Sequence, residues 1–177
     1  AINPPINGTY NIVAVYPHNT SSFTQGLIWH NNTLYEGTGL TSQSKLLKTD
    51  IATGKALQTL SIADSLFGEG IAVYNNKIYQ LTWQNHKVFV YDANTFKKEK
   101  EFNWNYEGWG ITHYNNQLII STGTSNLYFV NPTTLAIEKT LGVYDNNGYV
   151  ASLNELEMID GKIFANVWGE NKIIVIN

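Results

Sequence analysis

Residues 67–83 read FGEGIAVYNNKIYQLTW, and this stretch decides the fold. An acidic residue between two glycines, Glu69, is followed by an apolar run, the pair Asn75-Asn76 and a second apolar run. Asparagine tolerates the positive φ that a tight two-residue turn between antiparallel strands requires. The stretch is therefore predicted to form a β-hairpin whose first strand follows Glu69.

The same pattern occurs four times along the chain. The units begin near residues 23, 67, 107 and 153, and the position of Glu69 recurs every 40 to 45 residues. A third strand and a further turn follow the hairpin, and a fourth strand closes the unit. Four short antiparallel strands at this period indicate a β-propeller blade, and helical periodicity is absent. Residues 1–177 are predicted to form one all-β propeller domain; a sandwich of hairpins is disfavoured because sandwiches do not repeat a motif in register.

The end of the repeat leaves the ring incomplete. The fourth unit reaches Asn177 before its outer strand, so we expect a C-terminal blade to be missing and the ring to be either four-bladed or cut short. Propellers usually close by pairing an N-terminal strand with the last blade, and residues 10–16 (YNIVAVY) are predicted to be that strand. An open ring would leave sheet edges exposed, which folded proteins avoid.

Composition excludes several classes of function. The formal net charge is −3 and all 11 basic residues are lysine, which argues against nucleic-acid binding. The chain has no cysteine, so disulfides, thiol nucleophiles and thiolate metal sites are excluded. No apolar run has transmembrane length. The polar start at Ala1 lacks the pattern of a signal peptide and is interpreted as a mature or trimmed end.

Equivalent positions of the blades converge on the centre of a propeller, and here they carry different side chains. The first apolar strands are preceded by Gln25, Glu69, Trp109 and Asn154. The second strands end in Trp83 and Trp168 in two units and in glycine in the other two. Adding Phe23 and Phe67, two residues before their anchors, the predicted site consists of Phe23, Gln25, Phe67, Glu69, Trp83, Trp109, Asn154 and Trp168.

This site favours a small, partly polar ligand that is uncharged or cationic, since indole faces attract ammonium groups and carboxamides pair with amides. A carboxylate among tryptophan rings is desolvated, so the pKa of Glu69 is expected to rise until it can accept and donate a proton near neutrality. No metal-ligand set is apparent. The alternatives are that Trp83 and Trp168 pack between blades, that Gln25 and Asn154 tie down loops, and that Glu69 is a solvated turn residue. Trp29 and Trp104 fall outside the register and are interpreted as packing residues.

Seven ordered blocks resemble the plant and bacterial type of glutaminyl-peptide cyclotransferase, or glutamine cyclotransferase. The blocks are FTQGL (23–27), LYEGTG (34–39), FGEGI (67–71), YQLTW (79–83), YEGWGI (106–111), LNELE (153–157) and ANVW (165–168). The resemblance implies a five-bladed propeller, of which this chain covers about four blades. It also implies an enzyme without metal or other cofactor that cyclises the N-terminal glutamine of peptides or proteins to pyroglutamate and releases ammonia.

The family's active-site residues match the eight residues of the predicted site, with Glu69 as proton shuttle; a further lysine of the fifth blade has no counterpart within this chain. Family habit suggests a secreted or periplasmic protein, and the oligomeric state is left open. Two competing hypotheses remain: a non-catalytic propeller that binds a peptide end or small ligand, and a structural repeat protein that assembles with another chain. A lactonase-like metal propeller is less favoured because only one anchor is acidic.

Overall fold

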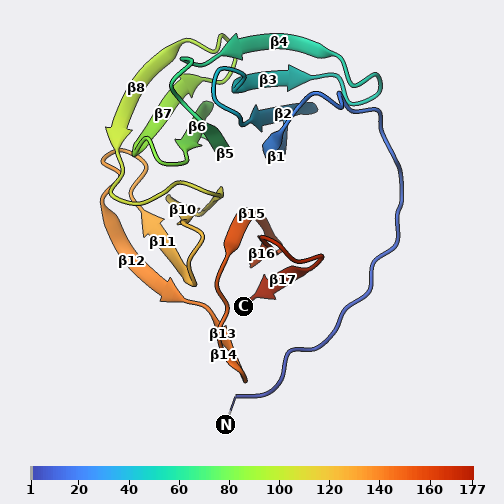
Figure 1. The fold of residues 1–177 in the computed structure, drawn as a ribbon, viewed down its shortest axis with the longest axis vertical. Helices are drawn as coiled ribbons and strands as arrows, with labels where there is room; N and C mark the ends of the chain where they lie inside the picture. Colours follow the sequence, from blue (N-terminus) through green and yellow to red (C-terminus); the bar gives the residue numbers. More distant parts are fainter. Residues whose placement is uncertain (1) are drawn as a thin grey trace.

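The computed structural model describes residues 2–177, so Ala1, with its expected mature end, lies outside the described part. All regular elements are β-strands, and their sheets are arranged around a common centre as the blades of a propeller (Figure 1). The prediction of an all-β propeller is thereby confirmed. Because residues 2–177 contain no helix, no helical segment in this part of the chain can span a membrane.

Three blades have four antiparallel strands and the fourth has three. Blade 1 comprises β1 (Thr24–His30), β2 (Thr33–Thr38), β3 (Lys45–Thr49) and β4 (Ala56–Ser61). Blade 2 comprises β5 (Gly68–Tyr74), β6 (Lys77–Thr82), β7 (Lys87–Asp92) and β8 (Lys98–Asn103). Blade 3 comprises β9 (Ile111–Tyr114), β10 (Gln117–Ser121), β11 (Asn126–Val130) and β12 (Ile137–Gly142). Blade 4 comprises β15 (Leu153–Ile159), β16 (Lys162–Val167) and β17 (Ile173–Ile176).

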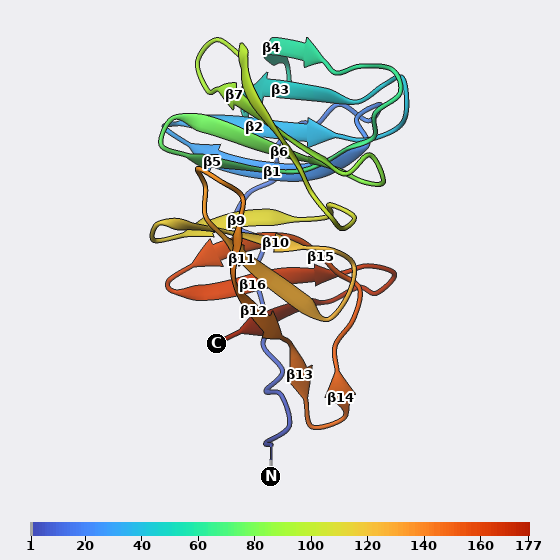
Figure 2. The same ribbon diagram turned by 90° about the vertical axis from the view of Figure 1, so that its left-hand side faces the viewer.

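A short hairpin of β13 (Tyr144–Asp145) and β14 (Gly148–Tyr149) connects blades 3 and 4 and projects from the body of the molecule (Figure 2). The turns between the first two strands of blades 1, 2 and 4 have the predicted positive φ at both positions, whereas in blade 3 only Asn115 does. Asn75 and Asn76 have φ of 48° and 58°, and Asp160 and Gly161 have φ of 49° and 76°. Positive φ at both turn positions gives the twist that joins antiparallel neighbours.

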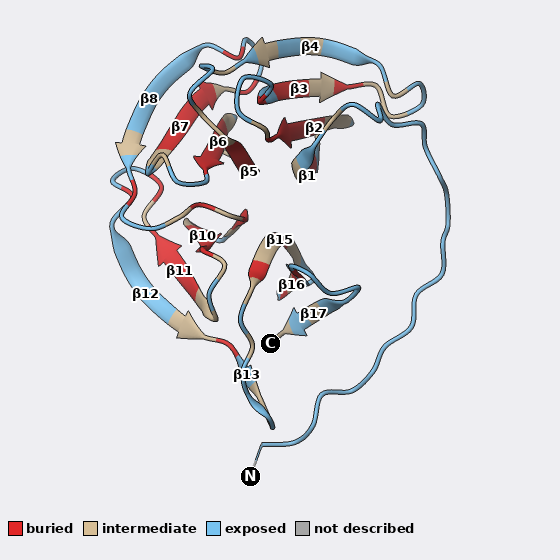
Figure 3. Cartoon of the chain, in the orientation of Figure 1, coloured by how far each residue is buried: buried red, intermediate tan, exposed pale blue. Residues whose placement is uncertain are grey.

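The hydrophobic core lies between neighbouring blades. Three clusters fill the interfaces of blades 1 and 2, blades 2 and 3, and blades 3 and 4. Successive side chains of one strand serve different interfaces: Ile78 packs toward blade 1 and Tyr79 toward blade 3. Both faces of the middle strands are therefore buried, whereas the outer strands β4, β8 and β12 are largely exposed (Figure 3).

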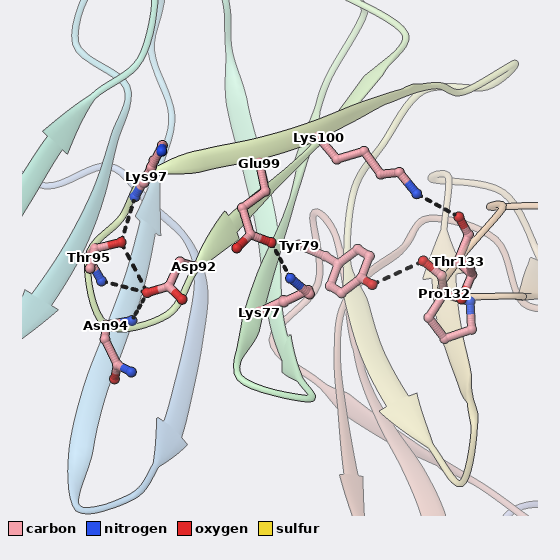
Figure 4. A network of polar contacts seen from close by, with 10 residues as sticks. All are labelled: Lys77, Tyr79, Asp92, Asn94, Thr95, Lys97, Glu99, Lys100, Pro132 and Thr133. Carbon is pink, nitrogen blue, oxygen red and sulfur yellow. Dashed lines mark hydrogen bonds and ion pairs between the residues drawn. The ribbon is translucent and has the colours of Figure 1, made fainter.

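Polar contacts from blade 2 to the outer turn of blade 3 add to this packing (Figure 4). The Tyr79 hydroxyl donates to the carbonyl oxygen of Pro132 at 3.0 Å, and the Lys100 ammonium donates to that of Thr133 at 3.1 Å. Tyr35 is the equivalent residue of blade 1 and donates to the carbonyl of Ala93 at 3.4 Å. A buried hydroxyl that meets a turn carbonyl satisfies two groups that would otherwise lose their contacts with water.

The ring is open between blade 4 and blade 1. The inner strands contact one another in the order β1, β5, β9 and β15, and a cavity of about 560 Å³ separates β15 and β16 from β1. Trp29 on β1 is about half exposed, so the expectation that it packs in the interior is wrong, whereas Trp104 is buried as expected.

The expected ring-closing strand, residues 10–16, is not formed in the structure. These residues form no strand, are exposed along their length and pass around the open side of the ring (Figure 1). The segment runs outside the ring, and β17, the edge strand of blade 4, pairs with β16 alone.

Candidate functional site

The four anchor positions all lie where the inner strands begin, and three of them lie in β-bulges. The pairing register shifts around Gln25 in β1, around Glu69 in β5 and around Asn154 in β15. Trp109 lies two residues before β9, and its backbone N–H donates to the carbonyl oxygen of Ser121 at 3.1 Å. A bulge turns a side chain away from the regular alternation of a strand, so these residues project toward the centre of the ring.

The glycines after the anchors let the inner strands approach closely. A Cβ on Gly26 would lie 2.6 Å from the backbone nitrogen of Ile71, and one on Gly70 would lie 2.7 Å from the carbonyl oxygen of Trp109. The N–H of Gly70 donates to that same oxygen at 2.9 Å. The glycines that follow the anchors therefore determine the distance between the inner strands of neighbouring blades.

Five of the predicted residues form two aromatic groups. Phe67 packs against Phe23 and Trp83, with ring centres 6.2 and 5.6 Å away. Trp109 and Trp168 form a second edge-to-face pair with ring centres 6.1 Å apart. Edge-to-face packing of this kind stabilises aromatic pairs by about 0.5–1.5 kcal/mol beyond the area they bury.

The structure gives a reason for the glycines that alternate with Trp83 and Trp168 in the repeat. A Cβ on Gly39 would lie 2.5 Å from the ring of Phe67, and one on Gly123 would lie 2.5 Å from the ring of Trp109. The two blades without a tryptophan at this position thus make room for an aromatic ring of the site.

Glu69 lies in the interior of the site, and its side chain is the main titratable feature there. The residue is 6% exposed. Burial, followed by the negative charge of Glu107, raises the pKa of Glu69 to about 8 from an ordinary value of 4.5. At neutral pH this carboxyl group is therefore mostly protonated, and a modest rise in pH ionises it.

Glu107 is a site residue that the repeat analysis did not select. One of its carboxylate oxygens, Oε2, accepts hydrogen bonds from the indole N–H groups of Trp83 and Trp109, both at 2.9 Å. Its other oxygen accepts from the side-chain amide of Gln84 at 3.0 Å. Glu107 occupies the same repeat position as Phe23 and Phe67, two residues before the anchor, and that register is the signal that could have identified it.

Glu155, which stands where the other blades have glycine, buries both carboxylate oxygens without a hydrogen-bond partner in the described residues. Its Oε2 would lie 2.6 Å from a Cβ on Gly70, so the side chain extends to the glycine beside Glu69. Burial and the charges of Glu157 and Glu69 raise the pKa of Glu155 well above its ordinary value. The centre of the ring thus holds a second carboxyl group for which the protonated form is favoured.

The remaining predicted residues border the open side of the ring. Gln25, Asn154 and Trp168 line the cavity between blades 1 and 4, together with Glu155 and Glu157. Trp168 is 66% exposed and contacts Trp109 edge to face. Among residues 2–177, no group of three or more histidine or acidic side chains is placed to hold a metal ion.

Comparisons with known proteins agree with one family. Residues 2–177 match the sequence profile of the family described as glutamine cyclotransferase. The glutaminyl-peptide cyclotransferase of Arabidopsis thaliana is 36% identical over 168 residues, which cover 94% of this chain and 52% of the relative. The chain thus spans about half the length of this curated relative.

Solved structures give the same family and the wider fold. The glutaminyl cyclase of Myxococcus xanthus superimposes with a TM-score of 0.88 at 30% identity, covering 94% of this chain and 70% of that one. The Pan2 WD40 domain of Neurospora crassa matches with a TM-score of 0.61 at 14% identity, covering 86% of this chain and 46% of that one. The second match concerns the propeller fold alone. The chain therefore covers about four blades of a larger propeller.

Proposed function

Because the chain belongs to the glutamine cyclotransferase family, we propose that it acts as a glutaminyl-peptide cyclotransferase. In this reaction the free amino group of an N-terminal glutamine attacks the carbonyl carbon of its own side-chain amide. A carbon–nitrogen bond forms, the bond to the amide nitrogen breaks, and the products are a pyroglutamyl peptide and ammonia. The proposed substrates are peptides or proteins that begin with glutamine.

The observation that supports this proposal most directly is the environment of Glu69. The reaction removes a proton from the attacking amine and delivers one to the departing nitrogen. A carboxyl group with a pKa of about 8 is close to the pKa of a peptide amino group, about 7.7–8.0, so the proton passes between them at little cost. Proton transfer by a positioned group of this kind accelerates reactions by about 10²–10⁴-fold.

The aromatic rings and carboxamides supply the rest of the proposed mechanism. Phe67, Trp83 and Trp109 form aromatic walls of the proposed site and would hold the glutamine side chain folded toward its own amino group while they exclude water. Such positioning holds the amino group close to the amide carbon that it attacks, and its contribution to the rate can equal that of the proton transfer. The carboxamide N–H groups of Gln25 and Asn154 are the candidate donors to the oxygen that becomes negative during the attack.

Ammonia release from a dipeptide that begins with glutamine tests the proposal. We expect release by the wild-type chain, with and without a chelator because the proposed mechanism uses no metal, and loss of nearly all turnover in Glu69→Gln. Glu138→Gln is the matched control, since it makes the same change to a carboxylate that lies on the outer strand β12 and accepts bonds from Gln117 and Asn131. Saturable binding of the dipeptide without ammonia release would support a non-catalytic binding propeller instead.

We further propose a secreted or periplasmic location, which rests on the family resemblance alone. Fractionation of cells that express the natural gene measures it, and recovery only with cytoplasmic markers would contradict it.

A further inference from the structure

We propose that Glu107 is a positioning residue that holds the indole rings of Trp83 and Trp109 in place through one carboxylate oxygen, which accepts a hydrogen bond from each ring. The inference deepens the proposed function and rests on it for its consequence in catalysis. Its structural and electrostatic parts concern the chain itself and can be measured without substrate.

The first argument is the hydrogen-bond geometry. An indole N–H can only donate, and each indole has a single such group, so its acceptor controls the plane of the ring. Trp83 belongs to blade 2 and Trp109 to blade 3, yet both donate to one oxygen atom, Glu107 Oε2, at 2.9 Å. Two walls of the site from separate blades are thus tied to one atom. This tie matters most for Trp83, which is 38% exposed and has less packing to hold it.

The second argument is that the segment carrying Glu107 is itself anchored. The N–H of Gly108 donates to the carbonyl oxygens of Thr82 and Trp83 at 3.0 and 3.2 Å. The indole N–H of the buried Trp104 donates to the carbonyl oxygen of Glu107 at 3.3 Å. A carboxylate on a backbone fixed from both sides can impose its position on the rings, rather than follow them.

The third argument is the charge. A neutral amide could accept the same two indole bonds, so the hydrogen bonds alone do not explain a carboxylate at this position. Burial opposes ionisation of Glu107, but the bonds from Trp109, Gln84 and Trp83 outweigh it, and the pKa of Glu107 lies below its ordinary value. Glu107 is therefore ionised when Glu69 titrates, and its charge raises the pKa of Glu69, second to burial.

The other titratable groups around these two carboxyls do not replace Glu107. Glu155 and Glu157 extend from β15, and burial raises the pKa of both, whereas Glu107 is the carboxylate whose charge, second to burial, raises the pKa of Glu69. The nearby His86 faces Glu107, where its charge favours the ionised carboxylate. Within residues 2–177, no lysine or histidine forms an ion pair with Glu69.

Two substitutions separate the roles of shape and charge. In Glu107→Gln the side-chain oxygen can still accept both indole bonds, while Gln84 can turn its amide to remain paired, so the rings stay in place and only the charge is lost. In Glu107→Ala both the charge and the acceptor are lost. The matched control is Glu138→Gln, which removes a doubly hydrogen-bonded carboxylate of the same blade away from the site.

The measurements are a carboxyl ¹³C NMR titration of Glu69, indole N–H signals from ¹H–¹⁵N spectra, and kcat and KM for a dipeptide that begins with glutamine. We expect Glu107→Gln to shift the titration of Glu69 to lower pH while leaving the indole signals and KM near wild type. We expect Glu107→Ala to move two of the five indole signals and to lower kcat/KM about 100-fold, as a misplacement of about 1 Å can. Glu138→Gln should match the wild type in all three.

The outcomes distinguish this inference from the proposed function. Suppose first that the wild type releases ammonia. The role of Glu107 is then overturned if Glu107→Gln leaves the titration of Glu69 unchanged, or if Glu107→Ala leaves the indole signals and kcat/KM unchanged. The proposed function stands in either case. If the NMR shifts occur as expected but the wild type releases no ammonia, Glu107 positions the rings and controls Glu69, and the cyclotransferase assignment fails.

Discussion

Replacement of Glu69 by glutamine is expected to abolish turnover and, at alkaline pH, to make the protein more stable. The native chain holds the Glu69 proton with a pKa of about 8, whereas the unfolded chain holds it with the ordinary value of 4.5. Between these values the folded state binds more protons than the unfolded state, so stability falls as the pH rises through this window. Below pH 4.5 both states are protonated, and Glu69 then contributes no difference.

The magnitude follows from the width of the window. One pKa unit corresponds to about 1.36 kcal/mol, so the full cost of ionising Glu69 in the folded protein is up to about 5 kcal/mol above pH 8. Glutamine has the shape of the protonated side chain and cannot ionise, so the variant escapes this cost. The charge of Glu69 also raises the pKa of Glu155, and relief of that effect changes stability in the same direction.

Urea unfolding followed by tryptophan fluorescence, at pH 4.5 and at pH 8.5, measures the effect. We expect Glu69→Gln and wild type to have similar free energies of unfolding at pH 4.5, and the variant to be more stable by several kcal/mol at pH 8.5. Glu138→Gln should show no such gain, because the bonds from Gln117 and Asn131 lower the pKa of Glu138. A Glu69→Gln variant with the same difference from wild type at both pH values would refute the reasoning.

Three further substitutions have matched comparisons or simple readouts. Gly123→Ala places a methyl group against the indole ring of Trp109 and should reduce both ammonia release and the free energy of unfolding. Gly161 has nearly the same φ but open space around it, so Gly161→Ala should cost about 1 kcal/mol of stability and leave ammonia release unchanged. Tyr79→Phe leaves a turn carbonyl of the next blade unpaired and should lower the free energy of urea unfolding by about 1–3 kcal/mol, more than Tyr35→Phe, whose bond is longer; equal effects would contradict this ranking. Glu155→Met removes a buried carboxyl group that has no partner and should raise the free energy of unfolding at pH 8 by about 1–3 kcal/mol, and a loss of stability would show that the carboxyl is satisfied in solution.

Much of the fold was predictable because its determinants are local. A blade needs apolar runs of strand length and turns that accept positive φ, and both recur at a constant spacing that can be read along the chain. The anchors were also predictable, because a repeat that keeps its glycine frame and changes one side chain per blade indicates a shared centre. Glu69, Trp83 and Trp109 were selected in this way. In the structure both indoles donate to Glu107, whose charge, second to burial, raises the pKa of Glu69.

The interpretation of residues without a clear register was less successful. Trp29 was expected to pack and is exposed, because its strand borders the open side of the ring and has no neighbouring blade there. The apolar pattern of residues 10–16 predicted a strand, but a strand forms only where an edge is within reach. Glu107 shares its repeat position with Phe23 and Phe67. Because it is a carboxylate and they are aromatic, it was not recognised as the equivalent residue of its blade.

By itself the sequence determined the all-β class, the repeat of about four blades and the hairpin turns, since each depends on a pattern of neighbouring residues that recurs along the chain. Only the tertiary structure decided that one oxygen of Glu107 holds two indole rings, that Glu155 is buried without a partner, and that the pKa of Glu69 is about 8. These properties depend on burial and on hydrogen bonds and charges supplied by other blades, 24 residues away for Trp83 and Glu107. Distances of this kind are set when the sheets pack around their common axis, and no local pattern encodes them.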